Sequence, residues 1–186
     1  MKDKKDRICP VERADSLDNR LRRWIQNPRR ILRPYISEGM TVLDFGCGPG
    51  YFTVDIAQMV GPGGHVIAAD LQEGMLRKLE GKIKGTDLEN NIVLHRCEED
   101  KIGISEQVDF VLTFYVLHEL PDQAAYFKEI ASILKPGGRI FIVEPPFHVS
   151  KSDFLKINNL ARENGFIPEK GPGIFLNKTL MLKKPL

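Results

Sequence analysis

A short apolar segment followed by a glycine-rich turn constrains this chain more than any other feature. Residues 41–53 spell Thr-Val-Leu-Asp-Phe-Gly-Cys-Gly-Pro-Gly-Tyr-Phe-Thr, which predicts a buried strand, a tight turn and the start of a helix. Gly46, Gly48 and Gly50 remove side chains that would keep a ligand off the backbone, and they permit positive φ. Backbone N–H groups at a helix N-terminus attract anionic ligand groups. The segment therefore predicts a ligand site where the strand ends.

The spacing of the glycines narrows the choice of ligand. A dinucleotide-binding turn has Gly-x-Gly-x-x-Gly, and counting from Gly46 its third glycine would be Tyr51. A tyrosine cannot occupy a position where backbone must meet backbone. This disfavours a nicotinamide-dependent oxidoreductase, an assignment that tight NAD binding would restore. No Gly-Lys-Ser/Thr follows the turn, so a phosphate-binding P-loop is excluded.

The pattern that is present, Asp44-x-Gly-x-Gly-x-Gly with Asp70 ending a second apolar segment, resembles motif I of class I S-adenosylmethionine-dependent methyltransferases. Three later segments resemble further strands and turns of that family in its order: residues 65–70, 108–119 and 134–144. The resemblance extends from about Arg30 to the C-terminus. It is strongest to the broad ubiquinone/menaquinone-biosynthesis-like group, the methyltransferase type 11 proteins.

Strand-like and helix-like segments alternate along the chain, which predicts an α/β fold built from βαβ units. The resemblance implies a Rossmann-like, seven-stranded, mostly parallel sheet with an antiparallel last strand and helices on both faces. We expect strands at 41–45, 66–69, 92–95, 110–115 and 139–143, and a closing hairpin within 166–183. Helices are expected from the turn to residue 60, over 73–84, from Pro121 onward, and over 152–164.

A chain of 186 residues suits one domain, and 1–186 is predicted to be a single methyltransferase domain. Residues 1–36 are expected to form a helical extension that covers the active site, because apolar residues recur at helical spacing over 15–27. Residues 1–33 hold eleven Lys and Arg against five Asp and Glu. This excess fits either a solvated helix or a cover that attracts an anionic group.

The resemblance implies which residues hold S-adenosylmethionine. The turn, including Cys47, takes the amino-acid end, Asp44 attracts the ammonium group and Asp70 binds the ribose hydroxyls. Leu71 and Met75 either contact the adenine or belong to the core. The family places an acid near the adenine where this chain has Cys97, so Glu98 or backbone groups take that role. Phe114 offers a backbone carbonyl and an aromatic wall beside the cofactor.

Two residues after the fourth strand are catalytic candidates. His118 could accept a proton from a substrate hydroxyl or amine, or it could serve only in packing. Tyr115 is the second candidate, in the wall around the transferred methyl group. Lesser candidates are Tyr51, Glu119, Glu144 and His148, and Cys9 could bind a soft acceptor. Catalysis by Cys47 is disfavoured, since no histidine adjoins it.

The expected partner is a small-molecule methyl acceptor. DNA is not expected, because no Asn-Pro-Pro-Tyr-like tetrad follows the fourth strand. Because the N-terminus is basic, a protein or RNA acceptor is kept as an alternative. A second alternative is a non-catalytic module that only binds S-adenosylmethionine or regulates a partner. The three cysteines lie far apart and no apolar run is long enough to span a membrane, which favours a cytoplasmic protein. No spacing of cysteine or histidine residues is typical of a metal site, so no metal is expected. The sequence leaves open whether the protein is a monomer or a dimer.

Overall fold

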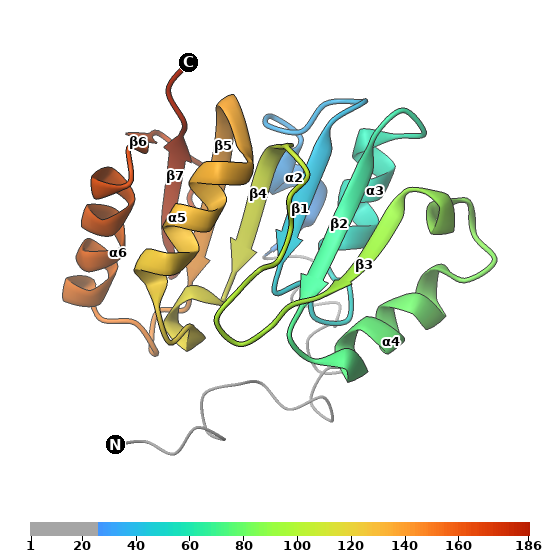
Figure 1. Cartoon of the computed structure of the whole chain (residues 1–186), viewed down its shortest axis with the longest axis horizontal. Helices are drawn as coiled ribbons and strands as arrows, with labels where there is room; N and C mark the ends of the chain where they lie inside the picture. The colour runs from blue at the N-terminus through green and yellow to red at the C-terminus, as the bar shows by residue number, and fades with distance from the viewer. Residues whose placement is uncertain (1–25) are drawn as a thin grey trace.

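The computed structural model describes residues 26–186, which form a seven-stranded sheet with helices on both faces (Figure 1). The strands are β1 (Thr41–Phe45), β2 (His65–Asp70), β3 (Ile92–Arg96), β4 (Val108–Phe114), β5 (Leu134–Glu144), β6 (Ile167–Glu169) and β7 (Lys178–Lys183). The α-helices are α2 (Pro28–Leu32), α3 (Thr53–Val60), α4 (Glu73–Ile83), α5 (Gln123–Ile133) and α6 (Lys151–Glu163). Two short 3-10 helices are η3 (Asp87–Asn90) and η4 (Leu117–Glu119).

The strand order is β3-β2-β1-β4-β5-β7-β6, and the first five of these strands are parallel. β7 lies between β5 and β6 and runs antiparallel to both. The predicted α/β class, the parallel sheet and the antiparallel closing strand are confirmed. In Figure 1, α5 and α6 lie in front of the sheet and α3 lies behind it.

Strand residues alternate between two cores because successive side chains point to opposite faces of a sheet. Val42 of β1 packs with α3 and α4, whereas Leu43 packs with α5 and α6. Both are fully buried, as expected for a strand that helices cover on both sides. The apolar strands predicted from the sequence therefore lie at the centre of the molecule.

Several element boundaries differ from the prediction. The expected helix start at Pro121 is wrong: α5 begins at Gln123, because the carboxylate of Asp122 accepts hydrogen bonds from the N–H groups of Ala124 and Ala125 and caps the helix there. The strand expected over 139–143 begins earlier, at Leu134, and this β5 strand pairs with β4 through a register shift between Val108 and Phe110.

The chain before β1 is part of the core from α2 onward. Ile31, Leu32 and Ile36 are buried and join the cluster formed by α3 and β1. The helix predicted over residues 15–27 lies almost wholly outside the described residues, as does Cys9. Within residues 26–186, no helix is both long enough and apolar enough to cross a membrane.

Candidate active site

The candidate residues gather at the edge where the parallel strands end. β1 and β4 are neighbours in the sheet, and their connections leave in opposite directions along it. In open α/β sheets, ligands bind in the crevice at such a switch point, outside the carboxyl ends of the strands. In Figure 1 this is the lower edge of the sheet, toward which the arrows of β1, β2 and β4 point.

Two glycines of the turn after β1 are required by their surroundings. A Cβ at Gly46 would lie 2.1 Å from Val116 Cγ2, and one at Gly50 would lie 2.4 Å from Leu79 Cδ1. Both have positive φ, at 73° and 83°. Gly48 also has positive φ, but its Cβ position has no atom within 4 Å, so open space lies beside the backbone there. The turn is tightly packed at its ends and open at its centre.

The backbone N–H groups of this turn are less available than the sequence predicts. Those of Gly46 and Cys47 donate to the carbonyl oxygen of Ala69, at 2.8 and 3.1 Å. Gly48 N–H donates to the Asp70 carboxylate at 2.9 Å, and Gly50 N–H donates to Cys47. Three of these four N–H groups are therefore bonded to the end of β2, and the fourth is bonded within the turn.

Two buried carboxylates face this turn. Asp44 accepts a hydrogen bond from the Thr53 hydroxyl at 2.6 Å, and burial, with a smaller contribution from Asp70, raises its pKa to about 7. Asp70 accepts from the N–H groups of Gly48 and Gln72, and burial raises its pKa as well. Among the described residues, neither carboxylate forms an ion pair with a basic side chain. Their negative charge is left for a ligand to balance.

The thiols near these carboxylates are protonated core groups. Burial, followed by the charges of Asp44 and Asp70, raises the pKa of Cys47 well above its ordinary value. Burial, with Asp70 and Glu129, raises the pKa of Cys97 to about 12. Neither thiol is a nucleophile at neutral pH, since reactivity belongs to the thiolate. Cys97 also donates its N–H to the Asp70 carbonyl oxygen, which ties β3 to the end of β2.

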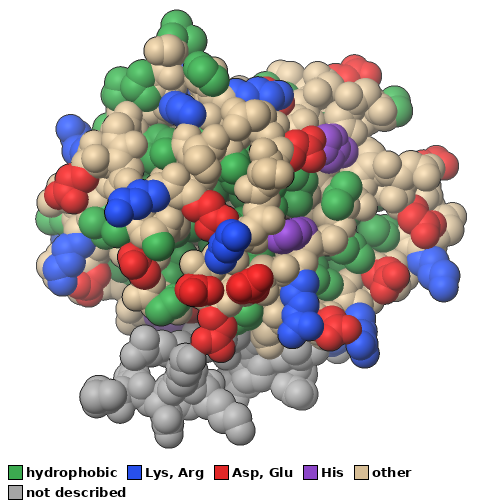
Figure 2. All heavy atoms as spheres, viewed as in Figure 1, with side chains coloured by type: hydrophobic (Ala, Val, Ile, Leu, Met, Phe, Trp, Pro, Cys, Tyr) green, Lys and Arg blue, Asp and Glu red, His purple; other side chains and the backbone are tan. Residues whose placement is uncertain are grey.

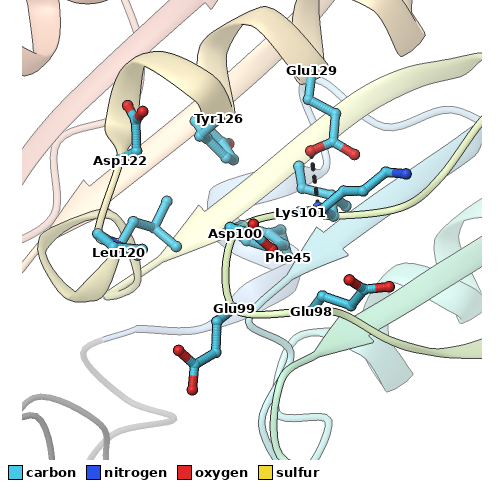
Figure 3. A pocket seen from close by; sticks show the side chains of 11 residues that line it. Phe45, Glu98, Glu99, Asp100, Lys101, Leu120, Asp122, Tyr126 and Glu129 are labelled. Atoms are coloured by element: carbon cyan, nitrogen blue, oxygen red, sulfur yellow. Dashed lines mark hydrogen bonds between the residues drawn. The ribbon is translucent and has the colours of Figure 1, made fainter.

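The residues proposed for the adenine differ in their surroundings. Met75 is buried at the start of α4, Leu71 is half-buried and Glu98 is exposed. Figure 3 shows a cavity between the loop after β3 and the start of α5, where Leu120 and Tyr126 approach the loop and Glu99 points away. Its volume of about 30 Å³ suits a water molecule rather than a purine.

The two aromatic residues at the end of β4 have different roles. Phe114 is buried against Phe52, with ring centroids 4.5 Å apart, and belongs to the core. Tyr115 has a φ of 65°, a strained conformation for a residue other than glycine. Its hydroxyl donates to Asn177 Oδ1 at 2.5 Å and accepts from Gln26 Nε2 at 2.7 Å.

Gln26 is also held by a second tyrosine. The Tyr51 hydroxyl donates to the Gln26 carbonyl oxygen at 3.0 Å. Two tyrosines, one from the glycine turn and one from the end of β4, thus bind the first described residue of the chain. The sequence named both tyrosines as candidates, but it carried no signal that Gln26 would join them.

His118 and Glu144 form the best-defined polar pair at this edge. Nδ1 of His118 lies 2.6 Å from Oε2 of Glu144, and the other carboxylate oxygen accepts the Leu117 N–H at 3.0 Å. Glu144 is fully buried at the end of β5, whereas the His118 side chain keeps 19% of its surface exposed. The carboxylate therefore orients the ring and fixes its tautomer, with the Nδ1 proton facing Glu144 and Nε2 able to accept a proton.

The charges around His118 determine its protonation. Burial alone lowers the pKa of His118, but the hydrogen bond to Glu144 and the charges of Glu144 and Glu119 together raise it above 6.5. Burial raises the pKa of Glu119 to about 7; the His118 charge lowers it, and Asp70 and Glu144 raise it. Glu119 is thus within electrostatic reach of both the ribose candidate and the His118–Glu144 pair. Figure 2 shows further acidic side chains gathered along this edge.

A family model described as a methyltransferase domain matches residues 36–167. The chain belongs to this methyltransferase family. The predicted resemblance to class I S-adenosylmethionine-dependent methyltransferases is confirmed, and the family implies S-adenosylmethionine as the cofactor.

Two relatives in the family carry a more specific name. The demethylmenaquinone methyltransferase of Listeria welshimeri is 29% identical over 122 residues, 66% of this chain and 51% of that protein. The protein of the same name from Lactococcus lactis is 36% identical over 107 residues, 57% of this chain and 42% of that protein. The chain thus spans about half the length of these curated relatives.

Solved structures show the same fold. A SAM-dependent methyltransferase from Aquifex aeolicus matches with a TM-score of 0.82 at 24% identity, covering 95% of this chain and 98% of that chain. The [4+2]-cyclase SpnF matches with a TM-score of 0.72 at 13% identity, covering 88% and 81%. Because a cyclase shares the family's fold, the fold alone does not define the reaction.

The residues of the site fit S-adenosylmethionine. The cofactor carries an ammonium group and a ribose diol, and the chain offers two buried carboxylates that have no basic partner among the described residues. The open space beside Gly48 leaves room for a ligand to lie against the backbone next to Asp70. A diol supplies two donors, which suits the two oxygens of Asp70.

Proposed function

We propose that this protein is a methyltransferase that uses S-adenosylmethionine to methylate a small molecule, with His118 as the base that receives the acceptor's proton. The observation that carries the proposal is the His118–Glu144 pair at the ligand-binding edge of the sheet. When bound, S-adenosylmethionine supplies a methyl group on a positively charged sulfur. The remaining tasks fall to the chain: binding, alignment and removal of a proton.

We assign the binding of the cofactor to the carboxylates and the turn. Asp44 balances the ammonium group, and Asp70 accepts the ribose hydroxyls. Asp70 now holds the Gly48 N–H, so ribose binding exchanges that hydrogen bond for one to the ligand and frees the Gly48 N–H for the cofactor's carboxylate. Leu71 and Met75 are proposed to contact the adenine, with Glu98 and the backbone of Cys97 at its edge.

We assign proton removal to His118. His118 Nε2 would take the proton that the acceptor atom loses when it becomes methylated. The buried Glu144 would stabilise the imidazolium that results, because its Oε2 lies 2.6 Å from Nδ1 and accepts a hydrogen bond from it. Tyr115, held between Gln26 and Asn177, is proposed to form part of the wall around the reacting groups.

The proposal is tested by turnover of S-adenosylmethionine with a panel of phenols, amines and thiols, with S-adenosylhomocysteine as the measured product. The His118→Gln variant is expected to lose about 10²–10⁴-fold in turnover, the usual contribution of a general base. Its affinity for S-adenosylhomocysteine should stay within twofold of wild type. Cofactor binding without turnover of any panel member would favour the non-catalytic module, and no cofactor binding would overturn the proposal.

A further inference from the structure

Three large apolar side chains stand exposed beside the candidate active site. Phe147 is 88% exposed in the loop after β5, and Phe175 and Leu176 are 73% and 63% exposed in the loop before β7. We call these three residues the apolar rim. Glu144 pairs with Lys178 at the last position of the β5–β7 ladder, so both loops leave the sheet at the same edge. Lys178 Nζ donates to the Pro146 carbonyl oxygen at 3.2 Å and holds the two loops together.

Contacts connect both loops of the apolar rim to the proposed catalytic residues. His148, the neighbour of Phe147, meets the His118 ring edge-on with ring centroids 5.8 Å apart. Asn177, the neighbour of Leu176, accepts the Tyr115 hydroxyl and donates to the Phe175 carbonyl oxygen at 2.8 Å. The loops that carry the apolar rim are therefore attached to the proposed catalytic residues through His148 and Asn177.

The backbone of the second loop is strained at one residue. Leu176 has a φ of 62°, in the left-handed region that residues other than glycine rarely adopt. Packing does not explain this conformation, since the side chain is exposed. Strained residues of this kind concentrate where a ligand is bound.

The polar side of the site carries negative charge. Glu119, Glu144 and His148 are the titratable groups that face His118 among the described residues, and two of them are carboxylates. An anionic acceptor group such as a phosphate or carboxylate would be repelled there. A neutral O–H or N–H group would be accepted.

Resting on the proposed methyl transfer, we infer that the acceptor is amphipathic. Its neutral O–H or N–H group reaches His118, and its aromatic or alkyl body lies on Phe147, Phe175 and Leu176. Exposed apolar surface of this kind marks a binding face, and the contacts above place it beside the reacting groups. The apolar rim thus determines which acceptors bind, whereas the His118–Glu144 pair acts on the acceptor atom.

The inference is tested by calorimetric binding of two matched probe pairs, phenol with 4-pentylphenol and aniline with 4-pentylaniline, in saturating S-adenosylhomocysteine. In wild type, the pentyl compound of at least one pair should bind tenfold or more tightly than its parent. The Phe147→Ser/Phe175→Ser variant should reduce that ratio to threefold or less. The matched control is Ile167→Ser, because Ile167 is 53% exposed on β6 and pairs with Lys183 at the opposite end of β7.

Other outcomes overturn the inference. A pentyl preference that is absent in wild type, unchanged in the double variant or equally reduced in Ile167→Ser would exclude the apolar rim as the acceptor surface. A dimer in sedimentation that the double variant dissociates would show that a second copy covers it. If wild type fails to bind S-adenosylhomocysteine, the proposed function fails. The affinity ratios of the probe pairs are then measured without S-adenosylhomocysteine, and they still decide whether the apolar rim binds the pentyl compounds.

Discussion

Nδ1 of His118 lies 2.6 Å from Oε2 of Glu144, although the two residues are 26 positions apart in the chain. Glu144 is the last residue of β5, and His118 lies in η4 after the neighbouring strand β4. The burial of Glu144 and its second hydrogen bond to the Leu117 N–H leave the carboxylate one orientation. The pair is therefore rigid before any substrate arrives.

Glu144→Gln is expected to lower the pKa of His118. The substitution removes the negative charge of Glu144, which raises this pKa, and leaves the opposing effects of burial, which lowers it, and of Glu119, which raises it. In wild type, the folded-state pKa of His118 lies above its unfolded value, so protonation stabilises the fold below pH 6.5, and this stabilisation is lost as pH rises through the folded pKa. Histidine titration by NMR measures the change. An unchanged titration would show that the pair does not persist in solution.

Asp70→Ala is expected to weaken S-adenosylhomocysteine binding by about 1.5–3 kcal/mol, the usual value of hydrogen bonds to a charged group. The comparison variant is Asp70→Asn, which keeps one acceptor oxygen for the N–H groups of Gly48 and Gln72 and should lose less affinity. Calorimetric titration measures both. Equal affinity in folded Asp70→Ala and wild type would remove Asp70 from the ribose site.

Alanine substitutions in the glycine turn are expected to lower the free energy of unfolding by different amounts, depending on whether the new Cβ only strains the backbone or also meets a neighbouring side chain. Gly48→Ala should cost about 1–2 kcal/mol, because it has positive φ but open space around Cβ. Gly50→Ala should cost about 2–4 kcal/mol, because its Cβ also meets the fully buried Leu79. The control, Gly81→Ala at an exposed position in the last turn of α4, should stabilise by about 0.5–1 kcal/mol. Urea unfolding ranks the three, and a cost at Gly48 equal to that at Gly50 would contradict this account.

Asp44→Asn is expected to change how stability depends on pH. The pKa of Asp44 is about 7 in the folded protein and near 3.8 when unfolded, so the folded state holds the extra proton between these values. The contribution of Asp44 to stability therefore falls as pH rises from about 4 to 7. The variant lacks this loss, so its stability relative to wild type should be more favourable at pH 8 than at pH 5. A pH-independent difference in urea unfolding would contradict the burial of an uncompensated carboxylate.

Deletion of residues 1–25 is expected to preserve the fold and lower turnover. The deletion retains Gln26 and the buried residues of α2, and it removes only the part of the predicted cover that precedes them. Deletion of residues 1–36 is the contrasting variant, and it should unfold the domain, because it removes Ile31, Leu32 and Ile36 from the core. Thermal unfolding and cofactor turnover measure the two effects. Wild-type kinetics in the shorter deletion would show that residues 1–25 do not cover the site.

Local patterns in the sequence were sufficient for much of this protein. The strand, turn and helix around Gly46–Gly50 follow from apolar residues and glycines that are adjacent in the chain. The buried strands follow in the same way, since each is a short continuous apolar segment. The positions of Asp44 and Asp70 at the ends of β1 and β2 needed no more than the lengths of those segments.

The tertiary structure decided how distant polar groups are paired. His118 meets Glu144 because β4 and β5 are parallel neighbours, and Tyr115 meets Asn177 because β7 runs antiparallel beside β5. The arrangement of the strands also allows the Gly48 N–H to donate a hydrogen bond to the Asp70 carboxylate. It brings the loops that hold Phe147 and Phe175 to one edge of the sheet. The sequence by itself determined which segments are buried and where each one turns, because those properties depend on neighbouring residues. Only the folded sheet decided which side chains share a hydrogen bond, because that depends on strand order and register.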